Sequence, residues 1–302
     1  MEKIAVTTTT FAEYDSSPLD LLRERGYEVA LNIKGRKLDG EDLLNLVRGC
    51  IGIIAGTEKY DRLILEKLSG VRVISRCGTG VESIDIKAAT EAGIKVINTP
   101  DAPTQGVAEF TIGLILSLLR KVPLMDRAMR NSLWKKEMGS LLNGKRIGII
   151  GMGRIGRKVA ELLGIFEVEI SFFDVKEGIR LGKCKFMEKA KLCAWADIIT
   201  LHCNAGSQGQ KVIGRDELSW MKKGSWLVNV ARGGLIDEAE LVACLKNGKL
   251  SGAAIDVFEN EPYKGPLLGL ENVILTPHVG SYARESRIAM ELEAAKNLLA
   301  GL

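Results

Sequence analysis

The sequence comprises 302 residues, a length that favours two domains at roughly 150 residues per domain. Hydrophobic residues make up 46% and charged residues 26% of the chain, which is ordinary globular composition and excludes disordered, collagenous and coiled-coil proteins. The formal net charge of +4 is too small over this length to indicate a nucleic-acid-binding surface.

The sequence also argues against membrane, disulfide-rich and metal-binding classes. The longest apolar stretch, residues 110–119, is interrupted by polar or small residues and is much shorter than the roughly 20 residues that a membrane span needs. The N-terminus, MEKIAVTTTT, has no apolar signal-peptide core. Six widely spaced cysteines form no CxxC pair and only two histidines occur, so we predict neither a disulfide framework nor a metal site. We expect a cytoplasmic protein with reduced thiols.

Short β-branched runs alternate with helical patterns along the whole chain, which predicts parallel α/β architecture. The runs fall into two sets, so we predict two doubly wound parallel sheets and hence two domains. The first set comprises residues 3–8, 27–32, 51–56, 71–77 and 95–98. The second set comprises residues 146–150, 167–174, 196–202, 225–231, 252–258 and 273–276.

The longest helical pattern lies between the two sets. It covers residues 105–119 and continues after Pro123 into residues 125–133, and we expect it to carry the chain between domains, with residues 100–103 as a hinge. The last helical pattern, residues 284–299, is expected to return to the first domain. We therefore predict a first domain of residues 1–98 completed by the helix 283–302, and a second domain of residues 99–282.

A glycine-rich loop in the second domain predicts a nucleotide site. The strand pattern at residues 146–150 runs directly into Gly151-Met-Gly-Arg-Ile-Gly156, after which a helical pattern begins. Glycines at this spacing permit a tight turn, close approach to a pyrophosphate and close helix packing. Asp174 ends the next strand, where an acid would bind the adenosine ribose and repel a 2′-phosphate, so NAD is predicted over NADP. The alternative is a structural turn followed by a strand cap.

Three strand ends carry residues suited to carbonyl reduction, which needs a proton donor and a cation for the substrate. Arg232 stands in a glycine-rich turn, Glu261 follows the run DVFEN, and His278 lies in the segment TPHVG. The carboxyl ends of parallel strands are where ligands bind in open α/β sheets. We therefore predict an active site around these three segments.

The segments GMGRIG, VNVARGGLID, DVFENEP and LTPHVGS, in this order with Asp174, resemble the D-2-hydroxyacid dehydrogenase family. The segment RCGTGVESID and the following GIKVINTP, within residues 76–100, look most similar to its D-3-phosphoglycerate dehydrogenase branch. This resemblance covers about residues 50–290. It implies a flavodoxin-like substrate domain, which would be the first domain, a Rossmann NAD-binding domain, which would be the second, and a homodimer.

The resemblance implies an NAD-dependent oxidoreductase that interconverts a D-2-hydroxy acid and its 2-oxo acid. The leading substrate is D-3-phosphoglycerate, as in serine biosynthesis. Two alternatives stay open. One is a dehydrogenase for an unphosphorylated acid such as lactate, glycerate or glyoxylate, and the other is a non-catalytic NAD(H)-sensing regulatory protein on the same fold.

Roles for individual residues also follow from the resemblance. Arg232 would bind the substrate carboxylate and carbonyl oxygen, His278 would exchange the hydroxyl proton, and Glu261 would orient the His278 ring. Glu259 is the alternative partner for the histidine. The residues implied in cofactor binding are Gly151, Gly153, Arg154, Ile155, Gly156, Asp174, His202, Ala231, Asp256 and Gly280. The residues implied in substrate binding, besides Arg232, are Gly78, Thr79 and Gly80. For His202 a purely structural role is the alternative.

The sequence departs from the family pattern in three places. The turn at residues 53–59 lacks the arginine that phosphoglycerate enzymes commonly place near the substrate phosphate, so Lys59, Arg76 or another residue would have to bind that phosphate. Asn204 stands where a proline is usual beside the cofactor. The chain ends at Leu302, from which we expect no C-terminal regulatory domain and no serine feedback.

Overall fold

The computed structural model describes residues 1–204 and 211–302, so the segment that follows Asn204 lies outside the described residues. The chain divides into two compact units. The first unit comprises Met1–Thr104 together with Ser281–Leu302, and the second comprises Gln105–Gly280. The boundaries expected from the sequence, 98/99 and 282/283, lie a few residues away from these.

The first unit contains a five-stranded parallel sheet in the order β2-β1-β3-β4-β5. This is the flavodoxin-like strand order, in which the sheet winds in both directions from the β1/β3 pair. Its strands are β1 (Lys3–Val6), β2 (Glu28–Leu31), β3 (Cys50–Ala55), β4 (Val73–Arg76) and β5 (Lys95–Asn98). Its helices are α1 (Ser17–Glu24), α2 (Gly40–Val47), α3 (Arg62–Leu65), α4 (Ile86–Glu91) and α11 (Arg284–Gly301).

The second unit contains a seven-stranded parallel sheet in the order β12-β11-β10-β9-β6-β7-β8. Counted outward from β6, this is the Rossmann order with one further strand, and the two sheets together confirm the predicted fold class. Its strands are β6 (Arg146–Ile150), β7 (Glu169–Phe173), β8 (Lys185–Phe186), β9 (Ile198–Leu201), β10 (Ser225–Asn229), β11 (Leu250–Ile255) and β12 (Val273–Leu275). Its α-helices are α5 (Thr104–Leu119), α6 (Val122–Arg130), α7 (Arg154–Leu163), α8 (Lys189–Trp195), α9 (Arg215–Trp220) and α10 (Glu238–Lys246).

Each sheet has an apolar core on both faces. In β1, Ile4 and Val6 join one cluster whereas Ala5, between them, joins the other, because successive side chains of a strand point to opposite faces. In β9, Ile198 and Ile199 divide between the two clusters of the second unit in the same way. Strands that are buried on both faces have continuous apolar sequences, which explains why these strands could be predicted from the sequence.

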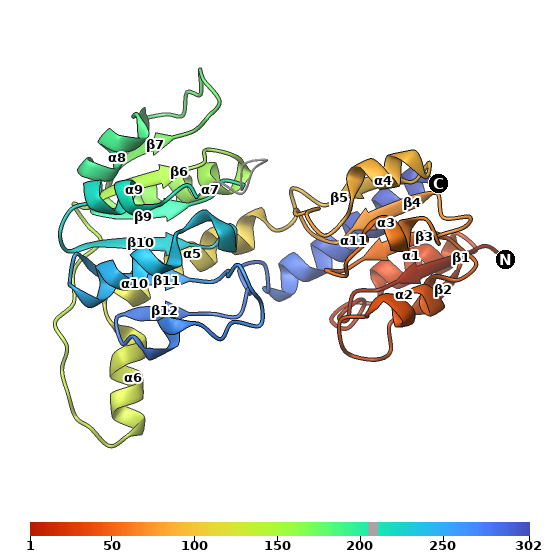
Figure 1. Ribbon diagram of the computed structural model, residues 1–302, viewed down its shortest axis with the longest axis horizontal. Helices are drawn as coiled ribbons and strands as arrows, with labels where there is room; N and C mark the ends of the chain where they lie inside the picture. The colour runs from red at the N-terminus through yellow and green to blue at the C-terminus, as the bar shows by residue number, and fades with distance from the viewer. Residues whose placement is uncertain (205–210) are drawn as a thin grey trace. The chain divides into compact units, whose positions relative to one another are not determined.

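The C-terminal helix α11 completes the first unit by packing on its sheet (Figure 1). Gly52 of β3 permits the approach, since a Cβ there would lie 2.9 Å from Leu298. A buried ion pair joins Arg287 to Glu291 at 2.8 Å, and Glu291 also accepts a hydrogen bond from the backbone N–H of Ala12. The helix therefore ties residues near both ends of the sequence into one core.

The structure corrects two expectations about local elements. The break between α5 and α6 lies at Lys121, whose φ is +54°, and not at Pro123. Pro123 instead lies in the first turn of α6, where a missing backbone N–H costs no helical hydrogen bond. The sequence also gave no indication of β8, a two-residue edge strand that is too short to show alternation.

Replacing Glu291 by alanine should lower the free energy of unfolding by about 3–5 kcal/mol, because the buried Arg287 guanidinium loses its charged partner. Urea denaturation followed by circular dichroism measures this change. Lys296→Ala, at an exposed position on the same helix, serves as the control and should change stability by less than about 0.5 kcal/mol. A fall in the free energy of unfolding of less than about 1 kcal/mol in the Glu291 variant would contradict the predicted stabilisation by this ion pair.

Candidate active site

The glycine loop after β6 is shaped by close backbone contacts. Gly151 has a φ of +96°, and a Cβ there would lie 2.6 Å from the backbone nitrogen of Cys203. A Cβ on Gly156 would lie 2.1 Å from the carbonyl oxygen of Gly151. Gly153 differs, since no atom of the described residues lies within 4 Å of its Cβ position at the N-terminus of α7. The loop thus leaves open space where helix N–H groups can meet an anion.

Asp174 is tied to this loop through one carboxylate oxygen, and its other oxygen binds the turn that follows Asp174 itself. One oxygen accepts the backbone N–H of Met152 at 2.6 Å, and the other accepts that of Lys176 at 2.8 Å. Each oxygen keeps a further acceptor position. The other predicted cofactor residues follow strands of the same sheet: Arg154 and Ile155 open α7, Ala231 follows β10, and Gly280 follows β12.

His202 follows β9 at the point where the strand order reverses between β6 and β9. Its Nε2 lies 2.9 Å from the Thr200 hydroxyl, whereas its enclosed Nδ1 has no hydrogen-bond partner in the described parts of the chain. Burial lowers the pKa of His202 to about 3, so the ring is neutral at physiological pH. An enclosed polar atom without a partner fits a pocket that receives a polar ligand.

His278 and Glu261 are hydrogen-bonded to each other. The Nδ1 atom of His278 lies 3.0 Å from one oxygen of Glu261, whose other oxygen accepts the backbone N–H of Phe258. Because a carboxylate only accepts, Nδ1 carries the proton and Nε2 is the ring nitrogen left to exchange one. Glu259, the alternative partner, is instead paired with Lys211 at 2.7 Å.

Asp256 holds the loop that carries His278. This fully buried carboxylate accepts hydrogen bonds from the Thr276 hydroxyl at 2.6 Å and from the backbone N–H groups of Val279 and Gly280, each at 2.9 Å. Burial raises the pKa of the Asp256 carboxyl despite these donors. These hydrogen bonds anchor the loop, and the part in cofactor binding that the sequence resemblance implied for Asp256 stays a prediction.

Arg232 follows β10 in a turn that Asn229 fixes. The Asn229 side chain accepts the backbone N–H of Ala231 and donates to the carbonyl oxygen of Arg232. A Cβ on Gly233 would lie 1.9 Å from the backbone of Phe258, so this turn packs directly on the loop that carries Glu261. Sequence reasoning missed Asn229, although a polar residue that ends an apolar strand is a usable signal.

The three catalytic candidates therefore follow neighbouring strands. Arg232 follows β10, Glu261 follows β11 and His278 follows β12, and these strands are adjacent at one end of the sheet. No group of three or more His, Cys, Asp or Glu residues that could hold a metal occurs within residues 1–204 and 211–302. In the same ranges, no helix is long and apolar enough to cross a membrane.

The predicted substrate loop, Gly78–Gly80, follows β4 in the first unit. The Gly78 N–H is engaged, since it donates to the carbonyl oxygen of Arg76 and to the Thr99 hydroxyl at 2.7 Å. The N–H groups of Thr79 and Gly80 make no hydrogen bond to another described residue. These two amides, and not that of Gly78, are the donors that this loop offers to an anion.

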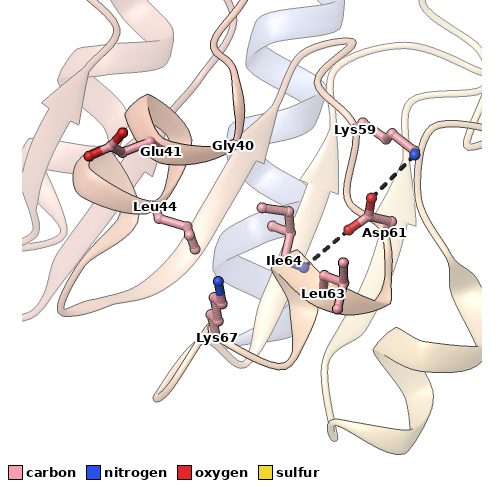
Figure 2. Close-up of a pocket in the computed structure, with 8 residues that line it drawn as sticks. All are labelled: Gly40, Glu41, Leu44, Lys59, Asp61, Leu63, Ile64 and Lys67. Carbon is pink, nitrogen blue, oxygen red and sulfur yellow. Dashed lines mark hydrogen bonds and ion pairs between the residues drawn. The ribbon is translucent and has the colours of Figure 1, made fainter.

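A surface hollow of about 460 Å³ lies elsewhere on the first unit, between α2 and α3 (Figure 2). Its lining residues are Gly40, Glu41, Leu44, Lys59, Asp61, Leu63, Ile64 and Lys67. Lys59 is paired there with Asp61 at 3.2 Å. The glycine loop, the Gly78–Gly80 loop and the three catalytic candidates all lie outside this lining.

The free energy of unfolding should fall as the pH drops below about 6.5, because His202 has a lower pKa in the folded protein than in the unfolded chain. The unfolded state then binds a proton that the folded state does not, which costs up to about 1.4 kcal/mol per pH unit down to about pH 3. Urea denaturation at about pH 7.5, 6.0 and 5.0 measures this slope. In His202→Gln, which cannot titrate, the free energy of unfolding should fall less steeply with decreasing pH. Equal slopes in the two proteins would refute the attribution of this pH dependence to His202.

Comparisons with known proteins extend these observations. Residues 112–280 match the family model described as D-isomer specific 2-hydroxyacid dehydrogenase, NAD binding domain. The chain is 40% identical over 275 residues to the D-3-phosphoglycerate dehydrogenase of Methanocaldococcus jannaschii, covering 87% of this chain and 52% of the relative. It is 36% identical over 275 residues to the glyoxylate reductase of Thermofilum pendens, covering 87% of this chain and 81% of the relative.

The chain spans about half the length of the phosphoglycerate dehydrogenases that it matches. Its fold is similar to the crystal structure of a protein from Thermus thermophilus, with a TM-score of 0.91, 34% identity, and coverage of 99% of this chain and 96% of that one. The chain therefore belongs to the D-isomer specific 2-hydroxyacid dehydrogenase family, and the cofactor of its second unit is NAD.

Proposed function

We propose that this protein is an NAD-dependent oxidoreductase that interconverts a D-2-hydroxy acid and its 2-oxo acid. The observation that carries the proposal is the His278–Glu261 pair at 3.0 Å. Glu261 follows β11, which lies between β10, the strand that precedes Arg232, and β12, the strand that precedes His278. In this proposal the first unit is the substrate domain and the second unit supplies the cofactor site and the catalytic residues.

The residues around the glycine loop fit NAD. The space at Gly153 faces the N-terminus of α7, where N–H groups would bind the pyrophosphate. Asp174 would accept hydrogen bonds from the adenosine ribose, and its charge disfavours a 2′-phosphate. The unpartnered Nδ1 of His202 would meet a polar group of the cofactor. When bound, the cofactor would supply a hydride as NADH in reduction or accept one as NAD⁺ in oxidation.

The side chains of the second unit would position the substrate and move its proton. The planar guanidinium of Arg232 would bind the substrate carboxylate through paired N–H donors and polarise the carbonyl oxygen. The Nε2 atom of His278 would give a proton to that oxygen in reduction and remove it in oxidation. Glu261 accepts a hydrogen bond from the Nδ1–H group, which fixes the orientation of the ring.

Two substrate classes have support. The names of the relatives from M. jannaschii and Archaeoglobus fulgidus favour D-3-phosphoglycerate, and thereby a place in serine biosynthesis. The name of the T. pendens relative favours glyoxylate, an unphosphorylated acid. Lys59, a candidate for phosphate binding, is paired with Asp61 at 3.2 Å, but its side chain is 79% exposed, so this weak ion pair leaves both substrate classes open.

We also propose that the protein forms a homodimer through α6 and the segment 131–142 that follows it. This region exposes large apolar side chains at positions where a lone chain would leave them in water. They are Val122, Met129, Leu133, Trp134, Met138 and Leu141. Trp134 is 81% exposed, and aromatic side chains of this kind are enriched in protein interfaces.

NADH oxidation followed at 340 nm tests the enzymatic proposal with phosphohydroxypyruvate, hydroxypyruvate, pyruvate, glyoxylate and 2-oxoglutarate. We expect turnover of at least one of these acids. His278→Gln should lower kcat by about 100- to 10,000-fold, the range for loss of a general acid–base group, with NADH affinity nearly unchanged. If the protein binds NADH but turns over none of the acids, the sensing alternative replaces the enzymatic one.

Gly153→Ala tests the cofactor site. The added methyl group meets no atom of residues 1–204 or 211–302, so thermal stability should stay within a few degrees of the parent. The methyl group does occupy the space proposed for the pyrophosphate. NADH affinity, measured by fluorescence titration, should fall at least tenfold. Gly164→Ala, which adds a methyl group in open space at the other end of α7, should leave the affinity unchanged. Equal affinities in both variants would contradict the proposed site.

A further inference from the structure

A buried polar cluster occupies the carboxyl edge of the first unit's sheet. It consists of Thr7, which follows β1, and of Glu58 and Tyr60, which follow β3. All three are buried, and Glu58 is only 2% exposed. The strands β1 and β3 are the adjacent pair from which this sheet winds in opposite directions. In open α/β sheets that position, outside the carboxyl ends of the strands, is where ligands bind.

The hydrogen bonds of the cluster point toward the Glu58 carboxylate. The Thr7 hydroxyl accepts the backbone N–H of Gly56 and lies 2.7 Å from one oxygen of Glu58. Since a carboxylate only accepts, the single hydroxyl proton of Thr7 points to Glu58, and the Tyr60 hydroxyl, at 3.2 Å, must donate to Thr7. Burial and the neighbouring Glu58 charge raise the pKa of Tyr60, which therefore stays neutral.

The same edge carries the proposed substrate loop. Strand β4 pairs with β3, with Arg76 opposite Ala55, so the loop Gly78–Gly80 begins beside the turn that contains Glu58. The guanidinium of Arg76 lies against the Cβ position of Gly78. Its positive charge partly offsets the rise in the pKa of Tyr60. With about 4.8 Å between neighbouring strands, the ends of β1, β3 and β4 lie within about 10 Å.

We propose that Glu58 is a specificity-determining residue that selects against a second negative charge on the substrate. The amides of Thr79 and Gly80 can hold one anionic group, and the buried Glu58 carboxylate repels another that approaches the same edge. At roughly 8 Å in a partly buried site, repulsion between two like charges weakens binding about tenfold or more. This inference rests on the proposed function and assigns short, singly charged 2-oxo acids as its substrate class.

The parent protein gives the first measurement. Hydroxypyruvate and phosphohydroxypyruvate differ only by the phosphate group, so the ratio of their kcat/KM values isolates the effect of the added charge. We expect kcat/KM to be at least tenfold higher for hydroxypyruvate, with the difference in KM and not in kcat. Equal values, or a preference for the phosphorylated acid, would overturn the proposal.

Glu58→Gln removes the charge while keeping an oxygen that accepts the Thr7 hydroxyl proton. It should lower KM for phosphohydroxypyruvate about tenfold and leave KM for hydroxypyruvate and both kcat values within twofold. Glu66→Gln, an exposed position near α3, makes the same charge change as a control and should leave both KM values unchanged. Equal losses toward both acids in the Glu58 variant would indicate a structural role and overturn the proposal. If that variant fails to fold, the ratio in the parent protein decides.

Equilibrium binding separates this inference from the proposed function. Glycolate and 2-phosphoglycolate are titrated calorimetrically into the NADH-loaded parent and Glu58→Gln proteins. About tenfold tighter binding of 2-phosphoglycolate to the variant, with glycolate unchanged, supports the specificity role even if no acid is turned over, in which case only the enzymatic proposal fails. Unchanged 2-phosphoglycolate affinity refutes the role of Glu58, whether or not turnover is seen.

Discussion

The Asp256 carboxylate is enclosed in the second unit and accepts three hydrogen bonds from the loop that carries His278. Burying a carboxylate is costly unless donors surround it, and these three donors all come from this loop. Movement of the loop would therefore remove these three hydrogen-bond donors from the buried Asp256 carboxylate. His278, whose φ is +55°, is held in a sparsely populated backbone conformation by the same hydrogen bonds.

Backbone contacts position the other candidate catalytic residues relative to the loop that Asp256 holds. The loop after β11 approaches His278 through Glu261 and approaches the Arg232 turn through Gly233, which has no room for a side chain. Asn229 then closes the Arg232 turn through its side-chain amide. The candidate catalytic side chains are exposed enough to meet a ligand, while Asp256 and Asn229, which position them, are buried and hydrogen-bonded. Such support preorganises a site without requiring its reactive groups to be buried.

The sequence predicted the strands well and the side-chain environments poorly, for a physical reason. Parallel strands buried on both faces must be apolar throughout, so each appears as a recognisable run, and Arg232, Glu261 and His278 follow such runs directly. The engagement of the Gly78 amide by Thr99, the burial of Glu58 and the break at Lys121 instead depend on contacts with residues distant in sequence or on packing. Local patterns carry no information about those contacts.

The return of α11 to the first sheet has a consequence for how the chain folds during synthesis. The second unit is continuous in sequence, whereas the first unit needs residues from both sides of it. Leu298 and the Arg287–Glu291 pair reach the sheet only after the whole second unit has been synthesised. The nascent first unit thus exposes the apolar face that α11 will cover for the whole time in which the second unit is made. An apolar face exposed in a partly synthesised chain favours aggregation.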